Sequence, residues 1–170
     1  FSKNGVKAIL ANSRPNDGTR ALVEASRRTP RAGFSVVPFI RVYRDRADYG
    51  TWHANPDIAA MIEEEAKRGY YRGVGEFHVF GRQAASGVVK RIVDFATAND
   101  LVLHAHCDEE ALAILFSHNP KARIIWAHTG FSTSLGRLEE LLARYPLLWG
   151  ELSYRGDVTA DGRLDPAWKA

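Results

Sequence analysis

Four histidines stand at or near the ends of three consecutive apolar runs, and imidazole can bind divalent metals or transfer protons. They are His78, His104, His106 and His128, and the runs cover residues 73–78, 101–106 and 124–128. In a parallel sheet the carboxyl ends of all strands lie on one edge. Three neighbouring strands that end in this way would therefore build one polar site on that edge.

Side chains alternate along a strand, so Glu76 should share a face with His78, and His104 with His106. Gly75, Phe77 and Ala105 should face the other way. Adjacent strands lie about 4.8 Å apart, which places Glu76, His104 and His128 within reach of one ion. Carboxylate and neutral imidazole suit Zn²⁺ above all, and also Mn²⁺ or Fe²⁺.

We therefore predict Glu76, His104 and His128 as metal ligands, with Glu76 and His128 in catalytic roles. His78 and His106 are predicted to contact substrate or to support the ligands. A bound ion would lower the pKa of its water and polarise a carbonyl or phosphoryl oxygen.

Other candidate groups lie outside these runs. Arg41 and Tyr43 end the run 34–42 on one face, where they could bind an anionic substrate or form a surface pair. Arg155, just after the last apolar run, has the same two interpretations. His53 is expected in a loop and His118 at a helix end, and Cys107 is expected to be a small buried residue facing away from the histidines.

The composition fits one domain, residues 1–170, with a sizeable core: 45% of the 170 residues are hydrophobic and 25% are charged. No apolar run approaches the roughly 20 residues that span a bilayer. One cysteine excludes an internal disulfide and permits a reducing compartment. We expect a cytoplasmic protein that acts on a small molecule, without nucleic-acid or membrane partners, and able to form a homo-oligomer. The chain begins with Phe1, as a fragment or processed product would.

Strand-like and helix-like segments alternate along the chain. Strands are expected near 6–11, 34–42, 72–79, 101–106, 124–128 and 147–153, and helices near 19–28, 55–67, 86–98, 108–118 and 134–144. Such alternation predicts an α/β fold with parallel strands and right-handed crossovers. No glycine-rich loop follows the first strand, which argues against a dinucleotide-binding sheet. Polar residues at successive strand ends favour a TIM-type barrel over a doubly wound sheet.

The runs Gly-Val-Gly-Glu-Phe-His, Val-Leu-His-Ala-His and Ile-Ile-Trp-Ala-His-Thr-Gly resemble the amidohydrolase superfamily, above all its amidohydrolase-related branch of metal-dependent hydrolases and decarboxylases. The resemblance implies a (β/α)₈ barrel, of which this chain would be strands two to seven. It implies that Glu76, His104 and His128 are the metal-site residues of strands four, five and six. The family's first-strand His-x-His and eighth-strand Asp have no counterpart in this chain.

The leading hypothesis is an amidohydrolase-like hydrolase in which metal-activated water attacks a small-molecule carbonyl or a related electrophile. Two alternatives remain open. One is a barrel that binds without metal or catalysis. The other is a TatD-like deoxyribonuclease, against which the small net charge of +3 argues mildly.

Overall fold

Six parallel strands form one sheet in the computed structural model, which describes residues 4–168. Their spatial order is the same as their order in the chain, from β1 to β6. The strands are β1 Ala8–Ala11, β2 Ser35–Ile40, β3 Gly73–Val79, β4 Val102–Cys107, β5 Ile124–Trp126 and β6 Leu148–Gly150.

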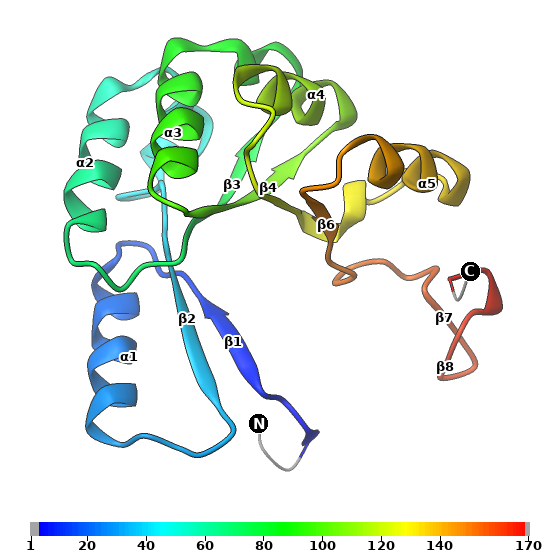
Figure 1. Cartoon of the computed structure of the whole chain (residues 1–170), viewed down its shortest axis with the longest axis horizontal. Coiled ribbons are helices and arrows are strands. Elements are labelled where there is room, and N and C mark those ends of the chain that lie inside the picture. The colour runs from blue at the N-terminus through cyan, green and yellow to red at the C-terminus, as the bar shows by residue number, and fades with distance from the viewer. Residues whose placement is uncertain (1–3, 169–170) are drawn as a thin grey trace.

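Five α-helices connect the strands and lie on the outer, convex side of the curled sheet (Figure 1). They are α1 Asp17–Arg28, α2 Pro56–Ala66, α3 Gly87–Ala98, α4 Glu109–His118 and α5 Leu135–Arg144. The result is a half-barrel whose concave side is open, with β1 and β6 at its two edges. The α/β class and the parallel order expected from the sequence are confirmed.

Side-chain caps start three of the helices at the residues where the sequence places them. Asn55 accepts a hydrogen bond from the backbone N–H of Asp57, and Pro56 occupies the first turn of α2. Ser86 and Asp108 accept equivalent bonds at the starts of α3 and α4. Each cap satisfies a backbone donor that the helix itself leaves unpaired.

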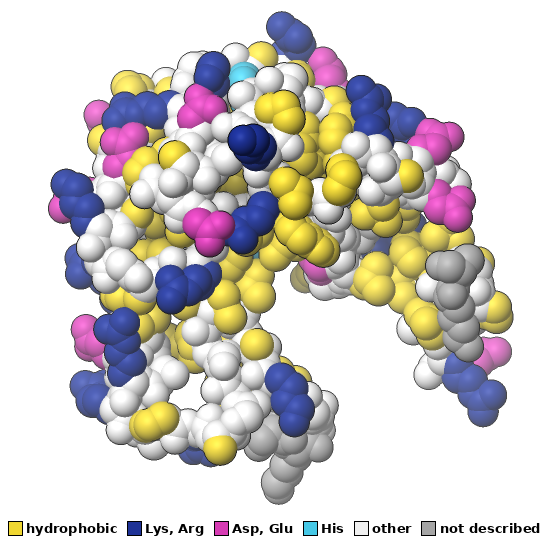
Figure 2. All heavy atoms as spheres, viewed as in Figure 1, with side chains coloured by type: hydrophobic (Ala, Val, Ile, Leu, Met, Phe, Trp, Pro, Cys, Tyr) yellow, Lys and Arg dark blue, Asp and Glu magenta, His cyan; other side chains and the backbone are white. Residues whose placement is uncertain are grey.

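The hydrophobic core lies between the sheet and the helices, and the alternation of β4 shows how. Leu103, Ala105 and Cys107 are buried on the helix side, whereas His104 and His106 are half-buried on the concave side. The concave side is also apolar away from its polar edge, as Figure 2 shows for the hollow between the two arms of the molecule. Apolar side chains there include Leu10, Ile125 and Trp149.

Two local expectations need correction, and one pair of strands was not foreseen. The fifth strand ends at Trp126, so His128 lies in a short 3₁₀ segment, Ala127–Gly130, and not on the strand. The sixth strand stops at Gly150 and does not reach Ser153. The segment after it forms a small antiparallel hairpin, β7 Thr159–Ala160 and β8 Arg163–Leu164, which the sequence did not predict.

Pro166–Trp168 forms a 3₁₀ turn, and residues 169–170 lie outside the described part. None of the described helices has the length and apolar character needed to cross a bilayer.

Candidate metal centre

Glu76 reaches the concave side through an irregularity in β3. Gly75 pairs with His104 and Phe77 pairs with Ala105, so Glu76 is an extra residue between two paired positions. Gly75 therefore lies on the same face of the sheet as His104. Regular alternation predicted the opposite face for Gly75, but the extra residue of the bulge shifts the alternation by one position. After it, His78 pairs with His106, and the polar side chains of both strands point into the hollow.

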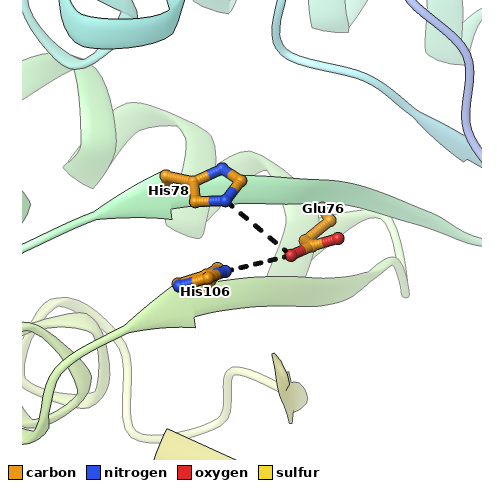
Figure 3. A group of neighbouring side chains, drawn as sticks. All are labelled: Glu76, His78 and His106. Carbon is orange, nitrogen blue, oxygen red and sulfur yellow. Dashed lines mark hydrogen bonds and ion pairs between the residues drawn. The ribbon is translucent and has the colours of Figure 1, made fainter. Parts of the chain in front are cut away.

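One carboxylate oxygen lies close to three histidine nitrogens. Oε1 of Glu76 is 3.2 Å from Nδ1 of His106, 3.6 Å from Nε2 of His128 and 3.9 Å from Nε2 of His78. Figure 3 shows Glu76 opposite the rings of His78 and His106, which come from adjacent strands. The predicted convergence of these strand ends is thus present in the structure.

His128 reaches this cluster from a left-handed turn. His128 and Thr129 have φ angles of 55° and 46°, a conformation that non-glycine residues adopt infrequently. The ring is held on its other side, where Nδ1 lies 3.0 Å from Oε1 of Glu151 and 2.9 Å from Oγ of Ser153. These contacts direct Nε2 towards Glu76.

Glu151 and Ser153 were missed as site residues by sequence reasoning. The available signal was that Gly150-Glu151 repeats the Gly75-Glu76 pair at the end of another apolar run. Glu151 also accepts a hydrogen bond of 2.5 Å from the backbone N–H of His128. Burial alone would raise the pKa of Glu151, but the hydrogen bonds from His128 and Ser153 outweigh it and leave that pKa lowered.

His104 differs from the other three histidines because it does not contact the Glu76 carboxylate. Among the described residues it makes no ion pair with Glu76, and both of its buried ring nitrogens lack a hydrogen-bond partner. It lines a cavity of about 610 Å³ together with Glu76, His128 and Glu151. A buried nitrogen without a partner costs roughly 1–3 kcal/mol, so His104 is suited to binding a ligand in this cavity.

Burial keeps most of the cluster neutral. It lowers the pKa of His78 to about 4, with the nearby His106 acting in the same direction. Burial also lowers the pKa of His104 and of His106, although Glu76 opposes it in both cases. Neutral imidazole is the form that binds metal.

Tyr43 and a residue that the sequence did not single out, Tyr49, hold the ring of His78. The hydroxyl of Tyr43 lies 2.9 Å from Nδ1 and that of Tyr49 lies 2.9 Å from Nε2. Arg41 stacks on the Tyr43 ring at 5.0 Å and donates to Oδ1 of Asn12. The expected Arg41–Tyr43 pair is therefore present, with Tyr43 directly on a site histidine.

Three other residues have structural partners. The Arg155 guanidinium is buried and paired with Asp157, so its substrate-binding interpretation is not favoured. His118 contacts the backbone oxygen of Ala84, as expected of a structural residue. Cys107 is buried on the helix side, and burial raises the pKa of its thiol.

The donor set fits a divalent cation. Ligand atoms of Glu76, His78 and His106 all lie within 4.8 Å of one another, so these three residues could hold a metal ion. This trio shares only Glu76 with the trio predicted from the sequence. His128 faces the same Glu76 oxygen, and His104 offers unpartnered nitrogens in the adjoining cavity.

Comparison with known proteins gives no relative: no family model, curated protein or solved structure matches this chain.

Proposed function

We propose that the chain is the middle of an amidohydrolase-like (β/α)₈ barrel, strands two to seven, and that its strand-end cluster is the metal centre of a hydrolase for small molecules. The observation that carries the proposal is the single Glu76 oxygen facing nitrogens of three histidines. The Glu76 carboxylate gains little as an ion pair from the neutral imidazoles of His78 and His106, whereas a cation bound beside it would stabilise its charge.

Glu76, His104 and His128 are the proposed ligands, preferably of Zn²⁺, with Mn²⁺ or Fe²⁺ as alternatives. The unpartnered nitrogens of His104 support its inclusion. A divalent ion would lower the pKa of bound water and polarise a substrate carbonyl. His106 borders the same Glu76 oxygen and would face the substrate.

His128 is held in the orientation that a metal ligand needs. Glu151 and Ser153 hold its Nδ1, so Nε2 is the nitrogen left to act on the Glu76 side. A carboxylate behind a histidine fixes the orientation of the ring and raises its basicity. Arg41, close to the Tyr43 ring, would contribute positive charge for an anionic substrate group.

Metal content of purified variants tests the proposal. We expect the intact protein to bind Zn²⁺, and Glu76→Ala, His104→Ala and His128→Ala each to weaken binding by about tenfold or more. Inductively coupled plasma mass spectrometry and competition with a chromogenic chelator measure this. His53→Ala is the matched control, because His53 lies outside the cluster. Wild-type affinity in Glu76→Ala would refute Glu76 as a ligand of this metal centre, whereas wild-type protein that binds no Zn²⁺ would favour a binding barrel without metal.

A further inference from the structure

The hydrogen bonds around His78 determine which of its ring nitrogens carries a hydrogen. The first is the bond from the backbone N–H of His78 to the hydroxyl oxygen of Tyr43, at 2.7 Å. A backbone N–H can only donate, so the Tyr43 oxygen accepts in this bond. That oxygen still has one hydrogen to donate.

The Tyr43 hydroxyl hydrogen has one acceptor among the described residues. Tyr43 is fully buried, and its hydroxyl lies 2.9 Å from Nδ1 of His78. If Nδ1 carried a hydrogen instead, the Tyr43 oxygen would accept twice and its own hydrogen would be buried without a partner. Because that arrangement is costly, Tyr43 donates and Nδ1 accepts.

The hydrogen of the His78 ring therefore lies on Nε2. Nε2 is 2.9 Å from the hydroxyl oxygen of Tyr49 and 3.9 Å from Oε1 of Glu76. Only the first distance is that of a hydrogen bond, so Nε2–H donates to Tyr49. While Nε2 carries this hydrogen it has no lone pair to offer a metal ion, so His78 is not among the ligands that we propose.

Tyr49 ends the chain of donors. It belongs to a short 3₁₀ segment, Ala47–Gly50, its ring lies 4.7 Å from that of His78, and its side chain is 45% exposed. The Tyr49 oxygen accepts the hydrogen of His78 Nε2, so the hydroxyl hydrogen of Tyr49 points away from His78. No other described residue takes that hydrogen.

We propose that Tyr43, His78 and Tyr49 form a one-directional chain of hydrogen bonds that offers the Tyr49 hydroxyl as a donor to a substrate carboxylate or carbonyl oxygen. Tyr43 is a positioning residue, and Tyr49 is the residue that contacts substrate. Donors aligned in one direction polarise one another, which strengthens the last donor. The substrate contact rests on the proposed function, whereas the position of the His78 hydrogen does not.

Nitrogen NMR of metal-free protein labelled with ¹⁵N-histidine tests the chain directly. We expect His78, assigned with His78→Gln, to show a bare Nδ1 and a protonated Nε2. In Tyr43→Phe, Nδ1 loses its donor and the ring should shift towards the form with hydrogen on Nδ1. A bare Nε2 in the wild-type protein would overturn the proposal, whatever the variant does.

Metal binding separates the donor role of His78 from a ligand role. His78→Gln should keep Zn²⁺ affinity within about threefold of wild type, because the hydrogen on Nε2 leaves His78 no lone pair for the ion, whereas Glu76→Ala removes a proposed ligand and should weaken binding by about tenfold or more. Equal loss in His78→Gln and Glu76→Ala would make His78 a ligand and overturn the proposal.

Acetohydroxamate, a small oxyanion, is the test compound for the substrate contact. In the Zn²⁺-loaded protein we expect Tyr49→Phe to raise its Kd about tenfold, as loss of a hydrogen bond to a charged acceptor does. Tyr154→Phe, at the other exposed tyrosine beside the cluster, should leave the Kd unchanged. Unchanged binding in Tyr49→Phe would overturn the contact. Wild-type protein that binds no Zn²⁺ would refute the proposed function, and the NMR result would still decide the hydrogen-bond chain.

Discussion

At the scale of single residues, three of the site histidines stay neutral where free histidine would begin to charge. The side chain of His78 is 17% exposed, and burial is the main reason its pKa falls to about 4. Burial has the same effect on the pKa of His104 and of His106. Neutrality lets the rings of His78 and His106 lie 4.1 Å apart without mutual repulsion, and it makes folding sensitive to pH.

Stability of the metal-free protein should fall as the pH decreases from about 7 to 5. The unfolded chain takes up a proton on His78 near pH 6.5, but the folded protein does so only near pH 4. Between these values the unfolded state binds more protons, so the free energy of unfolding rises with pH. Over this pH range His78 contributes at most about 2 kcal/mol to the change.

Urea unfolding at several pH values measures the change. The dependence should be weaker in His78→Gln than in wild type, and it should be unchanged in His53→Gln. A His78→Gln protein with the wild-type slope would show that His78 is not the source. The comparison uses the slope of the free energy of unfolding against pH, because the substitution also changes the free energy itself at every pH.

At the scale of elements, the sequence predicted regular features well and irregular ones poorly. The helix starts near Asn55, Ser86 and Asp108 were predicted, because capping depends on local chemistry. Alternation correctly placed His104 and His106 on one face of β4. It cannot reveal a bulge, because an inserted residue changes the pairing and leaves the pattern of residue types intact.

The left-handed turn that carries His128 was also beyond sequence reasoning, because neither histidine nor threonine marks such a backbone. Glu151 was missed for a related reason. Its role depends on β6 lying beside β5, which is a long-range pairing. That histidines would gather around Glu76 could be predicted from the strand ends, whereas the groups that orient His128 could not.

The β3 bulge gives a direct test at this scale. Gly75 has a φ of 127°, and a Cβ there would lie 2.2 Å from the backbone oxygen of His104. We expect Gly75→Ala to destabilise the protein by roughly 3 kcal/mol or more and to weaken Zn²⁺ binding, because Glu76 would be displaced. Denaturant unfolding and metal titration measure both effects.

Gly136→Ala is the control, since a Cβ at that position in α5 meets nothing within 4 Å. It should be neutral or stabilise the protein by up to about 1 kcal/mol. If Gly75→Ala behaved like Gly136→Ala, the geometry of the bulge would not be what positions Glu76.

At the scale of the whole molecule, the half-barrel places the site between two arms. The β1–β2 arm and the segment after β6 flank the open concave side (Figure 1). Apolar Leu10 and Trp149, 44% and 46% exposed, line the cavity from the two edge strands. The sequence predicted the order of strands because each crossover returns to a neighbouring position. It did not predict how the C-terminal segment is attached.

Arg155 makes that attachment. Its guanidinium donates to the backbone oxygens of Thr129 and Thr133, pairs with Asp157, and stacks on Trp168 at 4.8 Å. One side chain therefore ties the turn after His128 to the end of the described chain. This explains why a residue that resembled a substrate-binding arginine in sequence is buried.

Arg155→Met should loosen both regions at once. Methionine keeps much of the apolar length but leaves the Thr129 and Thr133 oxygens without their donor, a loss of roughly 1–3 kcal/mol. Hydrogen exchange followed by mass spectrometry should show faster exchange in residues 156–168 and in the turn 127–133. Asp157→Asn should have a much smaller effect, because Asp157 is 56% exposed and exposed ion pairs contribute little. Unchanged exchange in Arg155→Met would mean that the segment is held by its apolar contacts alone.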